Sequence, residues 1–276
     1  MYKNYSVLMS VYYKENPYYL KDSIESMIRQ TKVTDDFVLV CDGPLSKDLD
    51  TIISFYENRY PDIFHIVRLS QNSGLGNALR IGLPICKNEL IARMDSDDIS
   101  LSTRCEQQLN HFNTVPNCDV LSGTIAEFDD IYQNVKSYKK LPLAHSEIIE
   151  YSRYRSPINH PCVMYKKTKV LEAGNYQDFP FLEDYYLWIR MICNGSIFNN
   201  LPDLLLYMRA GQNMYERRGG AKYIKLRISF SYMLYTKAFI SLGDFFVLVG
   251  GQIIIGIIPN TLRKKFYYRF LRTYKL

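Results

Sequence analysis

Three of the four residues in segment 95–98 are aspartates, and the segment follows an apolar stretch directly. Residues two apart on an extended chain point to the same side, so Asp95 and Asp97 can converge on one cation. Carboxylate oxygens suit Mg²⁺ or Mn²⁺, which usually keep one or two carboxylates and take phosphate oxygens as further ligands. Such a cation would stabilise a departing diphosphate. A solvated acidic turn is the alternative interpretation.

Two further segments have the composition of a nucleotide site. Asp42 follows the apolar stretch 37–41, and its carboxylate can accept a hydrogen bond from a base ring N–H. An ordinary turn aspartate is the alternative. Asn72 and Gly74 precede a predicted helix that carries Arg80 one turn in. Glycine before a helix start lets backbone amides approach a phosphate, although loops also use glycine freely.

Glu183 and Asp184 open a segment, 184–194, whose apolar spacing is helical. A carboxylate near the ligand edge of a sheet can act as a general base that deprotonates an acceptor hydroxyl. Acids in a first helical turn also complement the helix dipole, which is the structural alternative.

The first half of the chain contains the elements that would position these residues. Strands are predicted at 5–11, 37–41, 63–69 and 89–94, and helices at 18–30, 47–59 and 74–83. This alternation predicts an α/β fold with a mostly parallel sheet covered by helices on both faces. Such sheets bind ligands at the carboxyl ends of their strands. Ser10, Tyr12, Asp42, Asp95 and Asp97 all stand at predicted strand ends, which predicts one site.

The C-terminal part has a different composition. After about residue 215 the chain is basic and apolar without strand alternation, so we expect a domain at 1–215 and a helical, basic segment at 216–276. Residues 260–276 carry six positive charges and no acid, which accounts for the formal net charge of +6. The apolar run 245–259 is shorter than the roughly 20 residues that span a bilayer. Together they predict a segment lying on an anionic membrane surface, or else a helix packed on the domain.

Cysteine and histidine spacing indicates no further metal or redox site. The six cysteines include no CxxC pair, and the four histidines show no paired spacing. We expect the cysteines to remain reduced, without disulfide bonds, in a reducing cytosol. The N-terminal residues lack the pattern of a signal peptide. We therefore expect a cytoplasmic protein that is peripheral at the inner face of the plasma membrane.

Five short segments occur in the order and spacing of glycosyltransferase family 2, which the chain resembles from about residue 5 to residue 220. They are Ser-Val-Leu-Met-Ser-Val-Tyr, Val-Cys-Asp-Gly-Pro, Asn-Ser-Gly-Leu-Gly-Asn-Ala, Ala-Arg-Met-Asp-Ser-Asp-Asp-Ile-Ser-Leu and Glu-Asp-Tyr-Tyr-Leu-Trp. The resemblance implies a Rossmann-like GT-A fold, a UDP-sugar or other nucleotide-sugar donor, Mn²⁺ or Mg²⁺, and inversion at the anomeric carbon. Segments 156–161 and 214–220 resemble bacterial members that build capsule, O-antigen or exopolysaccharide units. This implies a saccharide acceptor linked to polyprenyl diphosphate.

The resemblance also implies roles for single residues at the donor side. Ser10 and Tyr12 resemble the first nucleotide contacts, and Asp42 resembles the acid that recognises uracil. Asp95 resembles the acid near the ribose, within reach of the metal, and Asp97 resembles the metal ligand itself.

On the acceptor side, Asp184 resembles the catalytic base, with Glu183 beside it. Arg217 and Arg218 are candidates for pyrophosphate contacts, with surface charge as the alternative. Arg209 is a weaker candidate for the same contact. Three positions depart from the family pattern, namely Ser10 for a proline, Cys41 for an aspartate and Asn175 for a glycine.

We therefore expect an inverting, metal-dependent transferase that moves a hexose or N-acetylhexosamine, galactose-type favoured, from a UDP-sugar to a saccharide hydroxyl in bacterial surface polysaccharide synthesis. A nucleotidyltransferase of similar α/β fold is one alternative, although segment 12–15 lacks the glycine-rich loop it would carry. A non-enzymatic polyanion-binding protein is the other, suggested by the basic tail and 24 tyrosines. Acids at strand ends would repel nucleic acid, so we expect no nucleic-acid partner.

Overall fold

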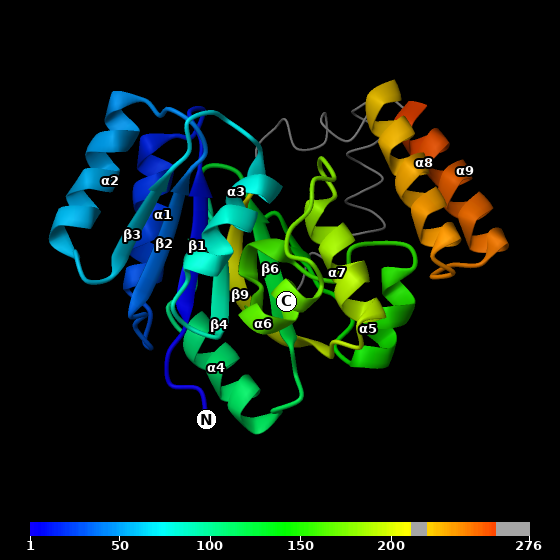
Figure 1. The fold of residues 1–276 in the computed structure, drawn as a ribbon, viewed down its shortest axis with the longest axis horizontal. Helices are drawn as coiled ribbons and strands as arrows, with labels where there is room; N and C mark the ends of the chain where they lie inside the picture. The colour runs from blue at the N-terminus through cyan, green and yellow to red at the C-terminus, as the bar shows by residue number, and fades with distance from the viewer. Residues whose placement is uncertain (211–219, 258–276) are drawn as a thin grey trace.

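The computed structural model describes residues 1–210 and 220–257, which form an α/β fold with a helical hairpin on one side (Figure 1). The first half alternates strand and helix as predicted, with all bounds within two residues. Its elements are β1 (Ser6–Val11), α1 (Pro17–Ile28), β2 (Asp36–Cys41), α2 (Lys47–Arg59), β3 (Phe64–Arg68), α3 (Leu75–Gly82) and β4 (Leu90–Asp95). The predicted α/β fold is confirmed.

The second half extends the same sheet. Its elements are β5 (Ile99–Ser100), α4 (Arg104–Thr114), β6 (Val120–Phe128), β7 (Ser137–Lys139), α5 (His145–Ser152), β8 (Met164–Lys166), α6 (Lys167–Glu172), α7 (Glu183–Cys193) and β9 (Phe198–Arg209). The strand order is β3-β2-β1-β4-β8-β6-β9-β5, with β7 beside β6. The strands β3, β2, β1 and β4 are parallel, and β8 runs antiparallel to both β4 and β6.

Local sequence explains where the first helices begin. The side chain of Asn16 accepts a hydrogen bond from the Tyr18 backbone N–H, and Pro17 occupies the first turn of α1. The Ser46 hydroxyl accepts a bond from the Leu49 N–H in the same way at α2. Such caps satisfy backbone donors that have no partner inside the helix.

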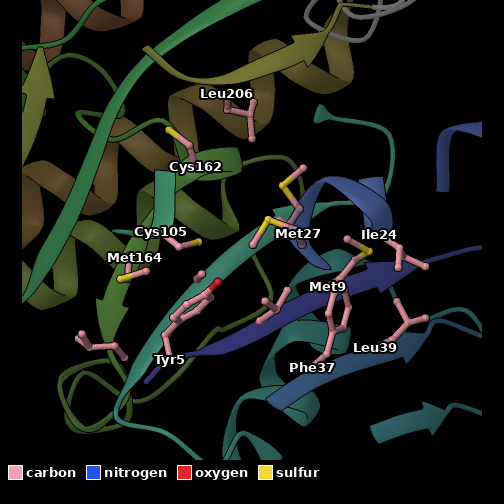
Figure 2. Packing of buried hydrophobic residues seen from close by; sticks show 14 of the residues in the cluster. Tyr5, Met9, Ile24, Met27, Phe37, Leu39, Cys105, Cys162, Met164 and Leu206 are labelled. Atoms are coloured by element: carbon pink, nitrogen blue, oxygen red, sulfur yellow. The ribbon is translucent and has the colours of Figure 1, made fainter. Parts of the chain in front are cut away.

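Apolar side chains on both faces of the sheet form the core. All six residues of β2 are buried, as expected for a strand covered by helices on both sides. Figure 2 shows part of one cluster, in which Met9 from β1 lies near Ile24 and Met27 from α1. The core therefore fixes the central strands, and with them the residues at their ends.

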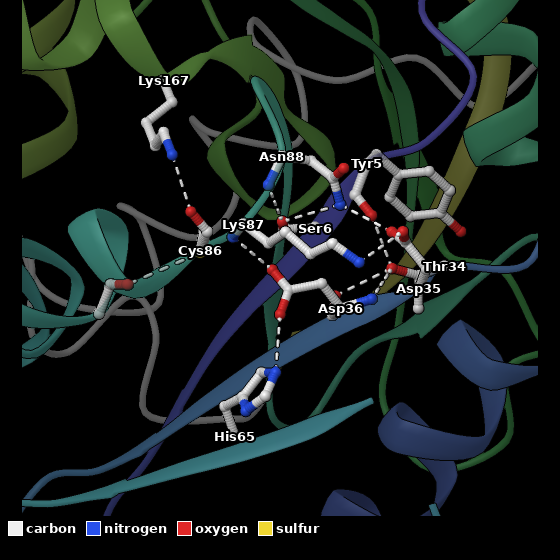
Figure 3. Close-up of polar contacts among 11 residues, drawn as sticks. Tyr5, Ser6, Thr34, Asp35, Asp36, His65, Cys86, Lys87, Asn88 and Lys167 are labelled. Atoms are coloured by element: carbon white, nitrogen blue, oxygen red, sulfur yellow. Dashed lines mark hydrogen bonds and ion pairs between the residues drawn. The ribbon is translucent and has the colours of Figure 1, made fainter. Parts of the chain in front are cut away.

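A polar cluster fixes the amino ends of β1 and β2 (Figure 3). Asp36 accepts a hydrogen bond from the Lys87 backbone N–H at 2.7 Å, and the Ser6 hydroxyl accepts one from the Asn88 N–H at 2.9 Å. The Asn88 side chain also donates to Asp35 at 2.7 Å. These bonds join both strands to the loop before β4. They fix the strands relative to one another, and so also fix the positions of the strand ends at the opposite, carboxyl edge of the sheet.

The C-terminal helices α8 (Ala221–Thr236) and α9 (Leu242–Ile257) form a hairpin that packs on α7. The rings of Tyr185 and Phe230 lie 4.7 Å apart, and the Tyr154 hydroxyl donates to Asp244. In the part of the chain described, no helix combines the length and apolarity needed to cross a bilayer. The domain boundary predicted between residues 215 and 216 lies outside the described residues and stays a prediction.

Candidate active site

Strand register brings the predicted nucleotide residues together at the carboxyl edge. Ser10 on β1 is paired with Asp95 on β4 and with Val40 on β2. The Asp42 backbone N–H donates to the Val11 carbonyl oxygen at 2.8 Å, so Asp42 follows the neighbouring strand end directly. Tyr12, just beyond β1, is exposed. The edge thus presents a half-buried serine, an exposed aromatic ring and two carboxylates within a few strand spacings.

Asp42 holds the loop before α3. One of its carboxylate oxygens accepts bonds from the Ser73 N–H and hydroxyl, and the other accepts bonds from the Gly74 N–H and the Asn72 side chain. A carboxylate has about four acceptor positions, so a nucleobase N–H could bind Asp42 only by displacing one of these donors. The structure therefore gives Asp42 a loop-organising role, while the predicted contact to uracil stays a prediction.

The start of α3 lies against the start of α7. A Cβ atom at Gly76 would meet the Cβ of Glu183 at 3.1 Å, so glycine is what permits this approach. The Asn175 side chain donates to the Arg80 carbonyl oxygen at 3.0 Å and ties the intervening loop to α3. Asn175 has φ +58°, a conformation that asparagine tolerates, which explains why it can replace a glycine. The Arg80 guanidinium is exposed and donates to Asn77.

Asp95 forms an ion pair with a buried arginine. Arg93 lies two residues earlier on β4, is 1% exposed, and donates from both terminal nitrogens to the two Asp95 oxygens. A second buried arginine, Arg104, donates to the Arg93 carbonyl oxygen at 2.7 Å. Bidentate pairing is the arrangement that best offsets the cost of burying charge. Arg93 occupies one acceptor position on each Asp95 oxygen, so Asp97 is the less engaged carboxylate of the predicted pair and the better candidate to bind a cation.

Asp97 belongs to a cluster of acidic side chains whose negative charges are only partly balanced by nearby cations and hydrogen-bond donors. Burial and the charges of Asp95 and Glu15 raise the pKa of Asp97. Asp98 is 1% exposed, and its Oδ2 atom has no hydrogen-bond partner in the part of the chain that the structure describes. Glu15 is held by the Ser96 hydroxyl at 2.5 Å. Excess negative charge of this kind fits a divalent cation.

No group of three metal-binding side chains is preassembled in the described residues. A cation held mainly by Asp97 would therefore need oxygen ligands from substrate and water, as Mg²⁺ and Mn²⁺ commonly do.

Arg209 closes the other side of this cluster. Its guanidinium stacks 3.6 Å from the Tyr19 ring centroid, and its backbone N–H donates to Asp98 at 2.8 Å. Its Nε atom donates to the Asp97 carbonyl oxygen at 3.1 Å. The end of β9 is therefore attached to segment 95–98 by both backbone and side chain.

Glu183 and Asp184 form the first turn of α7. Burial and the Asp184 charge raise the pKa of Glu183 to about 7. Burial raises the pKa of Asp184 as well, although the Ser156 hydroxyl, 3.4 Å from its Oδ2, opposes this. Phe181, just before the turn, has φ +66°, a strained conformation for an aromatic residue. Carboxylates with raised pKa values at such a position suit proton transfer near neutral pH.

Sequence reasoning missed two charged residues of this site, Glu15 and Arg93, and gave a third, Arg209, only as a weak candidate for a pyrophosphate contact. Arg93 did have a signal, because a cation inside an apolar strand must find a buried partner. Glu15 also had one, because it follows a strand end at the ligand edge. The structure attaches Arg209 to segment 95–98, and its contact to pyrophosphate stays a prediction. The candidates Arg217 and Arg218 lie outside the described residues.

Comparison with known proteins identifies relatives for this chain. Residues 6–174 match the family described as Glycosyl transferase family 2. The chain is 40% identical over 224 residues to the amylovoran biosynthesis glycosyltransferase AmsE of Erwinia amylovora, covering 81% of this chain and 83% of AmsE. It is 33% identical over 270 residues to the UDP-Gal:alpha-D-GlcNAc-diphosphoundecaprenol beta-1,3-galactosyltransferase of Escherichia coli, covering 98% and 97%.

The fold has solved counterparts. The mannosyltransferase of Pyrobaculum calidifontis, solved with GDP-Man and Mn²⁺, superposes with a TM-score of 0.61. The match covers 94% of this chain and 71% of that chain at 13% identity. At this identity the likeness speaks for the fold alone, and it confirms the GT-A fold expected from the sequence.

The role of Asp42 in the loop generates a stability prediction. We expect Asp42→Asn to lower the free energy of unfolding by about 1–3 kcal/mol without any nucleotide, because an amide group would face backbone donors at Ser73 or Gly74. Urea denaturation measures this change. The exposed Asp178 provides a matched control, and Asp178→Asn should leave stability unchanged. Equal stability of Asp42→Asn and wild type would contradict the loop-organising role.

Proposed function

The chain belongs to glycosyl transferase family 2, and we propose that it transfers a hexose or N-acetylhexosamine from a UDP-sugar to a hydroxyl of a lipid-linked saccharide. Galactose is the favoured sugar, the configuration at the anomeric carbon is inverted, and the setting is bacterial surface polysaccharide synthesis. The names of the two relatives support this setting, one by its exopolysaccharide and the other by its UDP-galactose donor and diphosphoundecaprenol-linked acceptor.

The observation that carries the proposal is the arrangement of two acidic groups around one edge of the sheet. Asp95 and Asp97 stand at the end of β4 beside Ser10 of β1, while Glu183 and Asp184 open α7. The two groups are near enough for the Asp95 charge to act on Glu183, and Gly76 at the start of α3 lies against the Glu183 side chain. One group suits the diphosphate side of a donor, and the other suits the attacking hydroxyl.

The proposed role of Asp184 is to take the proton from the acceptor hydroxyl as its oxygen attacks the anomeric carbon. An in-line attack requires the base and the leaving diphosphate to lie on opposite sides of the sugar, which gives inversion. Glu183 lies beside the base and against Gly76 at the start of α3. The loop held by Asp42 presents the backbone amides of α3 towards phosphate.

We propose that Asp97 holds Mn²⁺ or Mg²⁺, with Asp95 kept beside it by Arg93. When bound, the ion supplies positive charge at the leaving diphosphate. Glu15, whose charge acts on Asp97, adds to the negative potential that attracts it. Manganese in the Pyrobaculum calidifontis enzyme supports this proposal by fold likeness only.

A panel of UDP-sugars, assayed for release of UDP with and without manganese, tests the function. We expect a UDP-hexose or UDP-N-acetylhexosamine to give acceptor-dependent UDP release, and a chelator to abolish it. Asp97→Asn should lose both this activity and the rise in Tm that manganese and UDP give the wild type. In metal-free buffer this variant should melt no lower than wild type, because it removes a repelling charge. Release of pyrophosphate would instead favour the nucleotidyltransferase alternative.

The base assignment predicts a pH profile. A general base acts only when deprotonated, so kcat/KM should rise with pH through the raised pKa of Asp184 and then level off. Asp184→Asn should lower kcat by about 10²–10⁴-fold and remove this rise. UDP affinity, measured by calorimetry, should be unchanged.

Glu183→Gln provides the comparison for Asp184→Asn, because the two acids are neighbours in one turn. It should keep the rise of kcat/KM with pH if Asp184 is the base. Loss of the rise in Glu183→Gln together with its retention in Asp184→Asn would reverse the two roles.

We further propose that the protein works as a peripheral protein at the inner face of the plasma membrane, docked through α9. Five apolar side chains lie exposed along one face of this helix, namely Leu242, Phe246, Val247, Ile253 and Ile254. An exposed apolar stripe of this kind usually marks an interaction site. The sequence that follows, residues 260–276, carries six cations and no acid, which makes an anionic bilayer surface the complementary partner.

Sedimentation with vesicles tests the docking face. Wild type should bind vesicles of phosphatidylglycerol and phosphatidylcholine, more strongly at low salt than at high salt. The double variant Phe246→Glu/Ile254→Glu should bind at least about tenfold less, because each buried apolar side chain contributes about 1.5–3 kcal/mol. Phe55 on α2 is 60% exposed against 64% for Phe246, so Phe55→Glu is a matched control that should bind normally. Equal binding by both variants would rule out this face.

A further inference from the structure

Three arginines gather where the segment after α5 meets α7 and α8: Arg153, Arg155 and Arg227. Within residues 1–210 and 220–257, none of them has an acidic partner within ion-pair distance. Arg153 and Arg155 are exposed, and Arg227 is half-buried. Surface arginines without carboxylate partners are available to bind an anion.

Arg155 lies next in sequence to Ser156, which contacts the proposed base Asp184. The hydroxyl of the next residue, Ser156, lies 3.4 Å from the Oδ2 atom of Asp184. The segment is held in place by the Tyr185 hydroxyl, which donates to the Ser152 carbonyl oxygen at 2.5 Å. The backbone that carries Arg155 is therefore fixed against the first turn of α7.

Arg227 approaches the same turn from α8. It lies one helical turn before Phe230, whose ring is 4.7 Å from that of Tyr185, so both side chains are on the α7-facing side. Its Nε atom is buried and has no hydrogen-bond acceptor among the described residues. Burial raises the pKa of the Tyr185 hydroxyl, and the charges of Arg227 and Arg155 oppose this rise.

We propose that Arg155 and Arg227 bind the diphosphate group of the acceptor, next to Asp184. This inference rests on the proposed function, in which the acceptor sugar is attached to a lipid diphosphate. The two arginines come from different elements. Arg155 is next to the Ser156 contact to Asp184, and Arg227 lies one turn from the ring contact between Phe230 and Tyr185. Guanidinium groups recognise phosphate through paired N–H donors, and two of them match the two phosphates of a diphosphate.

Distance along the substrate supports this placement. When the accepting sugar is bonded directly to the diphosphate, its attacking hydroxyl and the nearer phosphate are separated by one sugar ring. An enzyme that deprotonates the hydroxyl must therefore hold the diphosphate within one ring of its base. Arg155, one residue from the Ser156 contact to Asp184, is placed for that contact. The donor diphosphate belongs instead at Asp97.

Binding in the presence of saturating UDP tests the proposal without requiring turnover. The probes are N-acetylglucosaminyl diphosphate bearing a short alkyl chain and the matching alkyl N-acetylglucosaminide without phosphate. Wild type should bind the diphosphate probe more tightly than the glycoside. Arg155→Gln and Arg227→Gln should each weaken diphosphate binding by about 10- to 100-fold, the loss expected for a charge-assisted hydrogen bond, and leave glycoside binding unchanged.

Two further variants make the test specific. Arg153→Gln is the matched control, because Arg153 is exposed two residues away and lines a cleft with Asp244 and Tyr235 instead; it should bind both probes normally. Arg227→Lys, which keeps the charge but loses the paired donors, should fall between wild type and Arg227→Gln. Urea denaturation checks that each variant is folded. If Arg227→Gln is unstable, Arg155→Gln alone tests the proposal, because Arg155 is exposed and its replacement should not affect folding.

The outcomes separate this inference from the proposed function. If wild type with UDP bound both probes equally, or if Arg153→Gln weakened binding as much as the other two, the assignment would be wrong. Loss of UDP affinity in Arg155→Gln and Arg227→Gln would place these arginines at the donor instead. Failure of wild type to release UDP from any UDP-sugar would overturn the proposed function while leaving the binding result standing.

Discussion

The site depends on one buried ion pair, between Arg93 and Asp95. A guanidinium inside a central strand loses its hydration, and only close bidentate pairing offsets most of that cost. Its charge also acts on Asp98, Glu183 and Asp184, where it opposes the rise that burial gives their pKa values. Without this cation, acids at the end of β4 and at the start of α7 would face each other across a poorly solvated space. Arg93 therefore allows both acidic groups to stand at one edge.

Gly76 and the first turns of α3 and α7 determine the remaining geometry of the site. Both α3 and α7 begin at this edge, and their first turns approach closely because Gly76 has no side chain to separate them from Glu183. Asp42 orders the loop before α3 with four hydrogen bonds. Backbone donors from one helix start and carboxylates from the other then face the same space, so phosphate and proton chemistry can be adjacent.

The sequence predicted the parallel half of this arrangement because its signals are local. Apolar runs such as β2 and polar residues directly after them can be recognised without knowing any partner, and parallel pairing then implies that Ser10, Asp42 and Asp95 meet. The contact between Gly76 and Glu183 joins residues more than a hundred positions apart, and nothing local specifies it. Strands β6 and β9 were not predicted either, although their pairing carries Arg209 to Asp98.

The region matched by the family covers the donor side of the site but not the acceptor side. The matched region, residues 6–174, contains every donor-side residue discussed in the described chain except Arg209. The proposed base on α7 and the hairpin of α8 and α9 lie beyond it. The helix α7 carries the acids on its first turn and packs on α8 through Tyr185 and Ile189. A ligand bound to the hairpin would therefore be connected to the proposed base through α7. A common donor half and a separate acceptor half in one rigid unit would let related enzymes change acceptors while the chemistry at the sheet edge stays the same.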